Sequence, residues 1–236
     1  MSDLELRYFD IRGRGQAIRN FFNAKKTFID TRIPLEANFA TWSQICNDTS
    51  QVGMFKKLPI LEVGKEQISE GLVILDYIHT HFGGGHSMPE KQNLQHAMLR
   101  SSLYQDLFQN VAVFLWADVA LKGVDVAAYA RFTLDRTLRL LESYDCILAE
   151  WEVTGLKKGE GYTMTDFLLA EGLDFAAYCF SSFIDWKKIP RLDEFRSTFS
   201  NDQDLKLQMG DIPEKFTGSP VEKEFVQRIP RLIQEK

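Results

Sequence analysis

A tyrosine and two arginines near the start of the chain have the types and spacing to bind an acidic ligand. Tyr8 ends a short run of alternating apolar and charged residues, and Arg12 and Arg14 follow within six positions. A phenol hydroxyl can donate a hydrogen bond, and guanidinium groups attract anions. The set suits an acidic ligand that also carries a weakly acidic proton. A tyrosine on a strand is more often a packed aromatic, and that alternative stays open.

These residues lie in a predicted turn between a strand and a helix. The alternation over residues 4–9 predicts a half-buried strand, and helical spacing begins at Ala17. Gly13 and Gly15 supply the permissive backbone that a tight turn needs. A dinucleotide-binding loop would use similar glycines, but Ile18 stands where that motif requires a small residue, so we set it aside.

The composition describes an ordinary soluble globular protein. Hydrophobic residues make up 44% and charged residues 26% of the chain. Its length of 236 residues is enough for one large or two small domains. The net charge of −5 argues against a nucleic-acid partner, and no apolar run is long enough to cross a membrane. The acidic start does not resemble a signal peptide. The three cysteines include no CxxC pair, which fits free thiols in a reducing cytoplasm.

The pattern along the chain changes near residue 83. Residues 1–82 are predicted to form strands and helices in the order strand, helix, strand, helix, strand, strand, helix, with Pro59 at the head of a strand. A glycine run and Pro89 mark a linker over 83–89. Residues 90–236 read as an all-helical domain, with long helices over about 90–121 and 126–150. After Gln208, glycines and prolines are expected to interrupt any long element.

A strong sequence signal for the start of a helix lies inside the predicted second domain. Thr163 and Asp166 have the spacing of a capping box, and Tyr162 and Phe167 are placed to close over the turn as a hydrophobic staple. The helix that follows is apolar enough to lie inside the domain. Pro190 is predicted to open one further helix.

Three motifs in this order resemble those of the cytosolic glutathione S-transferases. They are the Tyr8–Arg14 stretch, which is most similar to the tyrosine-type sigma class, the Leu58–Glu62 stretch with its proline, and the Thr163–Asp166 capping motif. The resemblance extends from the first strand to about Gln208. It implies a thioredoxin-like α/β domain followed by a helical-bundle domain, which is the glutathione S-transferase fold.

The resemblance also implies a catalytic pair. Tyr8 falls on the family's catalytic tyrosine, whose hydroxyl donates to the glutathione sulfur, and Arg14 falls on an arginine beside the thiol. A free thiol has a pKa near 8.5, and the thiolate is the nucleophile. Each pKa unit by which the site lowers that value corresponds to about 1.4 kcal/mol in favour of the anion.

The remaining glutathione contacts are carried over position by position. Besides Tyr8 and Arg14, the resemblance implies contacts from Trp42, Lys57, Leu58, Pro59, Glu70 and Gly71, and from Asp106 of a partner subunit. A helix that begins near Glu70 would offer free backbone N–H groups to the γ-glutamyl carboxylate. The electrophile is expected to lie against Phe9, Leu103, Tyr104 and Leu107. Glutathione is the expected co-substrate, and no metal is expected.

Three positions depart from the family pattern. Gly71 replaces a serine, Lys57 stands where glutamine or asparagine is usual, and Cys46 stands where related classes carry a lysine. Weaker glutathione binding with intact chemistry is the expected consequence. Restoring the hydroxyl with Gly71→Ser is accordingly expected to tighten glutathione binding about tenfold.

Two other features of the sequence have simpler interpretations. His79, His81 and His86 do not converge as metal ligands would, because residues two apart on a helix point to different faces. Phe55 resembles an aromatic key that some classes insert into a neighbouring subunit, although a core position explains it as well.

The sequence therefore predicts a cytoplasmic, homodimeric glutathione transferase that conjugates hydrophobic electrophiles in detoxification. One alternative is a glutathione-dependent isomerase similar to a prostaglandin synthase. Another is a ligand carrier or a crystallin-like structural relative with little activity. No nucleic-acid or membrane partner is expected.

Overall fold

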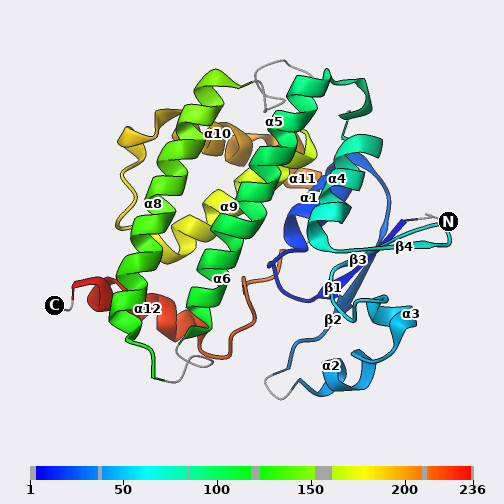
Figure 1. Ribbon diagram of the computed structural model, residues 1–236, viewed down its shortest axis with the longest axis horizontal. Helices are drawn as coiled ribbons and strands as arrows, with labels where there is room; N and C mark the ends of the chain where they lie inside the picture. The colour runs from blue at the N-terminus through cyan, green and yellow to red at the C-terminus, as the bar shows by residue number, and fades with distance from the viewer. Residues whose placement is uncertain are drawn as a thin grey trace.

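A computed structural model of the protein describes residues 4–36, 39–83, 85–117, 123–151, 161–208 and 212–234. A small sheet with its helices lies at one side, and a group of longer helices lies at the other (Figure 1). Among the described residues, no helix is both long and apolar enough to cross a membrane.

The sheet contains four strands in the order β2-β1-β3-β4. Their bounds are β1 Leu4–Phe9, β2 Ile29–Ile33, β3 Ile60–Val63 and β4 Glu66–Ser69. β1 pairs in parallel with β2 and antiparallel with β3, while β3 and β4 form an antiparallel pair. Because β1 is an interior strand, its carboxyl end, which carries Tyr8, lies near the middle of the sheet at the end where β1 and β2 terminate.

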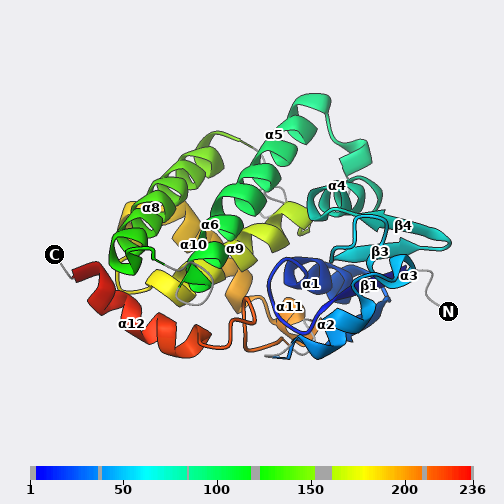
Figure 2. The same ribbon diagram turned by 60° about the horizontal axis from the view of Figure 1, so that its bottom comes forward.

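Helices α1 (Gln16–Lys25) and α4 (Gly71–His81) lie between the sheet and the long helices (Figure 2). α1 and α4 both contact α9 (Met164–Phe180), and α4 also contacts α5 (Glu90–Ser101). Phe21 of α1 and Phe167 of α9 meet edge to face with ring centroids 5.6 Å apart. The shorter helices α2 (Ala40–Ile45) and α3 (Thr49–Val52) lie between β2 and β3 in the chain.

The predicted first long helix is described to Leu115 and is not uniform. It consists of α5, a π-helical segment η2 (Ser102–Phe108) and α6 (Gln109–Leu115). The predicted end of this helix, at residues 118–121, lies outside the described residues. The second long helix, α8 (Val126–Glu150), has the bounds expected from the sequence. The predicted linker contains a 3₁₀ turn, η1 (Gly85–Ser87), while the division into two domains stays a prediction.

In the described residues after α9 there are three further helices and a 3₁₀ turn, η4 (Trp186–Lys188). α10 (Pro190–Asn201) begins at its proline as predicted, and α11 spans Gln203–Gln208. The expectation that no long element follows Gln208 is wrong, because α12 (Glu222–Gln234) contains thirteen residues with Pro230 inside it. Phe225, Ile229 and Leu232 form one buried face of α12 against α8, α9 and α6. This burial offsets the backbone hydrogen bond that a proline removes.

The capping box predicted at the start of α9 is present. The Thr163 side chain accepts from the Asp166 backbone N–H, and Asp166 Oδ2 accepts from the Thr163 backbone N–H at 2.6 Å. Tyr162 and Phe167 lie edge to face with ring centroids 6.1 Å apart. The cap is almost completely buried, so it defines the start of a helix that runs through the core.

A buried histidine on α4 makes stability depend on pH. His79 is 1% exposed, and its Nε2 lies 3.2 Å from Asn93 Oδ1. Burial first, and then the positive charge of Arg100, lower the pKa of His79 to about 4, against the opposing effects of the Asn93 hydrogen bond and of Asp76. The His96 ring lies 4.7 Å away.

Because the unfolded chain binds the His79 proton near pH 6.5 and the native chain only near pH 4, acidification favours unfolding across this window. We expect this histidine to cost about 2 kcal/mol of unfolding free energy between pH 7.5 and pH 5. Urea unfolding at both pH values should show a smaller loss for His79→Gln, which stays neutral. Equal losses in both proteins would contradict the assignment.

Candidate active site

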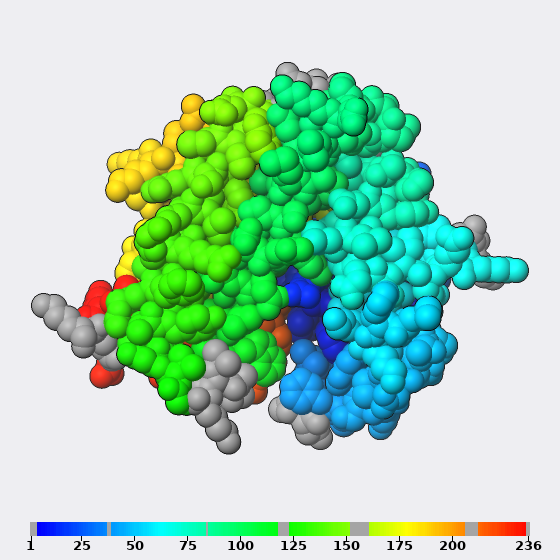
Figure 3. Space-filling model, viewed as in Figure 1, coloured from blue at the N-terminus to red at the C-terminus, as the bar shows by residue number. Residues whose placement is uncertain are grey.

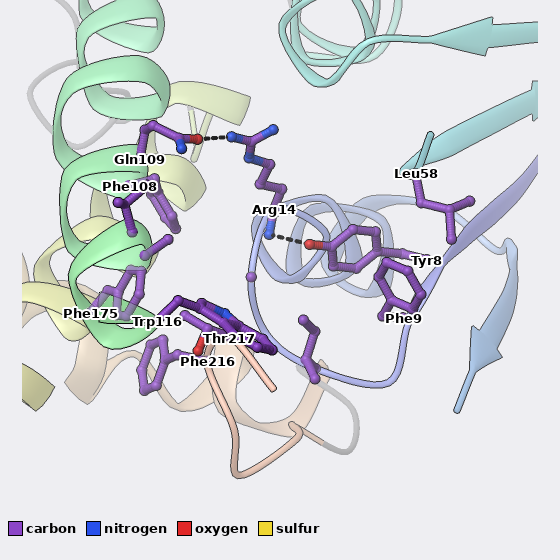
Figure 4. A pocket seen from close by; sticks show the side chains of 14 residues that line it. Tyr8, Phe9, Arg14, Leu58, Phe108, Gln109, Trp116, Phe175, Phe216 and Thr217 are labelled. Atoms are coloured by element: carbon purple, nitrogen blue, oxygen red, sulfur yellow. Dashed lines mark hydrogen bonds between the residues drawn. The ribbon is translucent and has the colours of Figure 1, made fainter. Parts of the chain in front are cut away.

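Tyr8 lies under the turn that joins β1 to α1. Its hydroxyl oxygen accepts a hydrogen bond from the Arg14 backbone N–H at 3.1 Å (Figure 4). Gly13 has a φ of +37°, and a Cβ there would lie 2.6 Å from the Tyr8 hydroxyl. A Cβ at Gly15 would lie 2.8 Å from the Tyr8 ring at Cγ. Both glycines therefore let the turn pass directly over the tyrosine.

The Tyr8 hydroxyl is held in its protonated form. Burial raises the pKa of Tyr8, while the Arg14 N–H and the charges of Arg14 and Arg19 oppose this rise only in part. A neutral phenol at physiological pH can donate its proton in a hydrogen bond to an anion. Tyr8 thus has the state required of a donor to a thiolate.

Arg19, whose role was not predicted from the sequence, stabilises this turn by hydrogen bonds to its backbone. Its fully buried guanidinium donates to the carbonyl oxygens of Phe9 at 3.0 Å and Ile11 at 2.9 Å, and it pairs with Asp30 at 2.9 Å. It also lies 5.7 Å from the centre of the Tyr8 ring. No sequence pattern distinguishes this arginine from an exposed one on α1.

The two predicted arginines have different surroundings. Arg12 forms a two-pronged ion pair with Glu171 of α9, with both N–O distances 2.7 Å, and its guanidinium lies over the Phe216 ring. Arg14 instead donates to the side-chain oxygen of Gln109 on α6, across the cavity from Tyr8 (Figure 4). Arg12 therefore connects the β1–α1 turn to α9 through an ion pair, whereas Arg14 lines the cavity.

An apolar cavity lies beside Tyr8. Its volume is about 420 Å³, within the range that holds a small ligand. The space-filling view shows a hollow between α6 and the blue N-terminal segment (Figure 3). Lining residues come from five segments of the chain: Tyr8, Phe9, Ile11, Gly13 and Arg14; Leu58; Phe108, Gln109, Ala112, Val113 and Trp116; Phe175; and Phe216 and Thr217.

Of the residues expected beside the electrophile, Phe9 lines this cavity, whereas Leu103 and Leu107 do not. Those two leucines have no exposed surface and pack near Gly172 of α9. The lining side chains of the helix lie further along, from Phe108 to Trp116. The two leucines lie in the π-helical segment Ser102–Phe108, whose hydrogen-bonding pattern differs from that of an α-helix. The sequence carries no signal for this difference.

The C-terminal loop closes one wall of the cavity. Phe216 and Thr217 both line it, and the backbone carbonyls of Lys215 and Phe216 accept from the N–H groups of Arg12 and Gly13 at 2.8 and 2.7 Å. The buried Glu222 carboxylate accepts from the Phe216 and Thr217 N–H groups. The segment expected to be loose thus pairs with the turn that carries the candidate catalytic residues.

The other predicted contact residues surround the sheet edge near Tyr8. Trp42 meets Phe9 edge to face at 5.2 Å, and the Leu58–Pro59 peptide bond is cis. Lys57 Nζ lies 4.0 Å from Glu70 Oε1, and both side chains are exposed. Lys57 therefore lies close to Glu70 at the start of α4, whereas Trp42 lies beside Phe9 at the end of β1.

Gly71 has a neighbour that the sequence did not predict. A Cβ at this position would overlap the Tyr104 hydroxyl oxygen and would lie 2.9 Å from Tyr104 Cε2. Tyr104 is therefore placed at the start of α4 and not in the apolar cavity. The expected gain in binding from Gly71→Ser did not account for this neighbour, and the serine would need space that the tyrosine ring occupies.

Two further predicted features involve charged side chains. Asp106, predicted to reach a partner's glutathione, pairs with Arg136 of its own chain at 2.9 Å. Within the described part of the chain, no three histidine, cysteine or acidic side chains come together in a way that could hold a metal ion. His79 packs in the core, as described above.

Comparison with known proteins identifies relatives of this chain. No protein-family model matches it. It is 26% identical over 201 residues to the probable glutathione S-transferase gst-36 of Caenorhabditis elegans, a match that covers 83% of this chain and 87% of that protein. Probable glutathione S-transferase 9 of the same organism is 36% identical over 84 residues, which cover 35% of this chain and only 37% of the relative.

Solved structures extend this similarity to the whole fold. A Pi-class glutathione S-transferase of Onchocerca volvulus superposes with a TM-score of 0.66 at 23% identity, over 87% of this chain and 91% of that chain. This chain therefore has the glutathione S-transferase fold, and over most of its length it is similar in sequence to curated glutathione S-transferases.

Proposed function

We propose that this protein is a glutathione transferase that joins the glutathione thiolate to hydrophobic electrophiles. The observation that carries the proposal is a buried, protonated Tyr8 hydroxyl at the edge of an apolar cavity. The sulfur forms a new bond to the electrophilic carbon, and the leaving group departs with its electron pair. Detoxification is the role that such a substrate range suggests.

Tyr8 and Arg14 act on the sulfur in this proposal. The Tyr8 hydroxyl donates a hydrogen bond to the thiolate, and the Arg14 N–H at 3.1 Å holds the tyrosine oxygen in place. Both the donor and the positive charge of Arg14 favour the ionised thiol. At neutral pH the bound sulfur is then ionised to a greater extent than in free glutathione.

The tripeptide lies from Tyr8 toward the start of α4. Leu58 offers its backbone beside the cysteine, Trp42 contacts the glycine end, and Lys57 and Glu70 face the charged γ-glutamyl end. The electrophile occupies the aromatic cavity, where Phe108, Trp116 and Phe216 are among the lining residues. Apolar walls around a reactive sulfur favour hydrophobic, planar substrates.

Two measurements test the function directly. Retention on immobilised glutathione tests binding, and turnover of a generic aryl halide tests conjugation. A carrier or crystallin-like protein would give binding without turnover. A glutathione-dependent isomerase would be retained but would leave the aryl halide unconverted. Absence of retention would refute the proposal itself.

We also propose that the protein is a cytoplasmic homodimer of the tyrosine type, closest to the sigma class, with domains at 1–82 and 90–236. Exposed apolar side chains support the dimer: Met54 is 88% and Phe55 63% exposed, and Leu94 and Met98 lie uncovered on α5. Exposed apolar residues are expected to lie in an interface more often than other surface residues.

Phe55→Ser tests this interface. If Phe55 inserts into the partner, its loss is expected to raise the dimer dissociation constant about thirtyfold, which corresponds to about 2 kcal/mol. Sedimentation over a concentration series measures this change. Phe132→Ser is the matched control, because Phe132 is similarly exposed on α8. A wild-type protein that stays monomeric at high concentration would rule out the dimer.

A further inference from the structure

The start of α4 lacks a side-chain cap of its own. Glu70 occupies the N-cap position with a φ of +68°, and no side chain there accepts from the first turn. The first residue of the helix, Gly71, has no side chain that could bind a ligand. The backbone N–H groups of the first turn of α4 are therefore free to bind a group that lies next to Gly71.

What lies over Gly71 is the Tyr104 side chain. Its hydroxyl oxygen occupies the space where a Cβ at position 71 would stand. Tyr104 comes from the π-helical segment Ser102–Phe108, and it is only 7% exposed. A side chain from a different part of the fold thus brings a hydroxyl to the helix start, where position 71 itself has none.

The hydrogen of this hydroxyl is available to an acceptor. The Arg14 guanidinium lies 5.0 Å from the centre of the Tyr104 ring and interacts with its side chain. Since a guanidinium only donates hydrogen bonds, it cannot take the tyrosine proton. Burial chiefly raises the pKa of Tyr104 to about 12, so the group stays protonated at neutral pH.

We propose that the Tyr104 hydroxyl donates to the γ-glutamyl carboxylate of glutathione at the start of α4, and so replaces a side-chain donor at position 71. The inference rests on the proposed function, because it requires glutathione to bind along this edge. It makes Tyr104 a ligand-binding residue at a distance from the sulfur chemistry.

The first test pairs Tyr104→Phe with a ligand that lacks the carboxylate. Calorimetry should show that the variant binds glutathione about tenfold or more weakly than the wild type, because a hydrogen bond to a charged group is lost. Both proteins should bind 4-aminobutyryl-cysteinyl-glycine with equal affinity. The turnover number at saturating glutathione should stay nearly unchanged, because the contact acts alike in the ground and transition states.

Tyr144→Phe is the matched control, since Tyr144 is also buried and its hydroxyl contacts Ser102 at 3.0 Å in the same helical segment. Its glutathione affinity should equal that of the wild type. If the wild type binds glutathione and Tyr104→Phe binds it equally well, the role of Tyr104 is refuted while the proposed function stands. If the wild type does not bind glutathione, the proposed function fails as well.

The second test moves the hydroxyl donor from position 104 to position 71. Gly71→Ser alone should weaken glutathione binding at least tenfold, because the new side chain displaces Tyr104. Combining Gly71→Ser with Tyr104→Ala should restore affinity to within a few fold of the wild type, since the serine then has both the space and the hydroxyl. Tighter binding by Gly71→Ser alone, or no recovery in the folded double variant, would overturn the inference.

Discussion

Replacing Tyr8 with phenylalanine is expected to lower kcat/KM for conjugation by a factor of about ten to a thousand. The substitution keeps the ring that packs against Gly15 and removes only the hydroxyl that would donate to the sulfur. The pKa of the bound thiol should rise accordingly, so the pH–rate profile should shift to higher pH. Fold and glutathione affinity should change little.

Steady-state kinetics across pH and the thiolate absorbance of bound glutathione both measure this effect. Tyr162→Phe serves as the control, because it also removes one tyrosine hydroxyl, here one that donates to Asp202 at 2.9 Å outside the site. An unchanged pH–rate profile in Tyr8→Phe would mean that another group activates the sulfur.

The largest expected effect on stability comes from Arg12→Ala. Glu171 has a side chain that is only 2% exposed, and Arg12 neutralises it through two hydrogen bonds of 2.7 Å. Removing one partner of a buried ion pair leaves an uncompensated charge and costs about 3–5 kcal/mol of unfolding free energy. The loss also removes the contact between α9 and the turn that follows Tyr8, so activity should fall in parallel.

The pH dependence of this variant has a definite sign. Burial already raises the pKa of Glu171 in the wild type, and Arg12 acts against that rise. Without Arg12 the native state favours a protonated Glu171 more strongly, so the destabilisation should shrink as the pH falls toward 5. Urea unfolding at pH 8 and pH 5 measures the change.

Arg139→Ala is the matched control for a salt bridge in solvent. Its pair with Asp135 on α8 has side chains that are 76% and 58% exposed. Solvent screening limits such pairs to less than about 1 kcal/mol. If Arg12→Ala were no more destabilising than Arg139→Ala, Arg12 would not be the partner that neutralises Glu171.

The sequence by itself determined those features whose cause is local. Alternating apolar and charged residues predicted β1, a capping box predicted the start of α9, and Pro190 predicted the start of α10. Each signal depends on residues within one or two turns of one another, so it can be recognised without the fold. The glycines of the first turn belong to the same group, because a tight turn over Tyr8 requires them.

Only the tertiary structure decided the features that join distant segments. Leu103 and Leu107 are buried while the cavity is lined from Phe108 onward, the buried face of α12 overrode Pro230, and Tyr104 filled the space above Gly71. Each depends on which side chain from elsewhere occupies a given volume. Packing in three dimensions sets that choice, and a one-dimensional pattern contains no information about it.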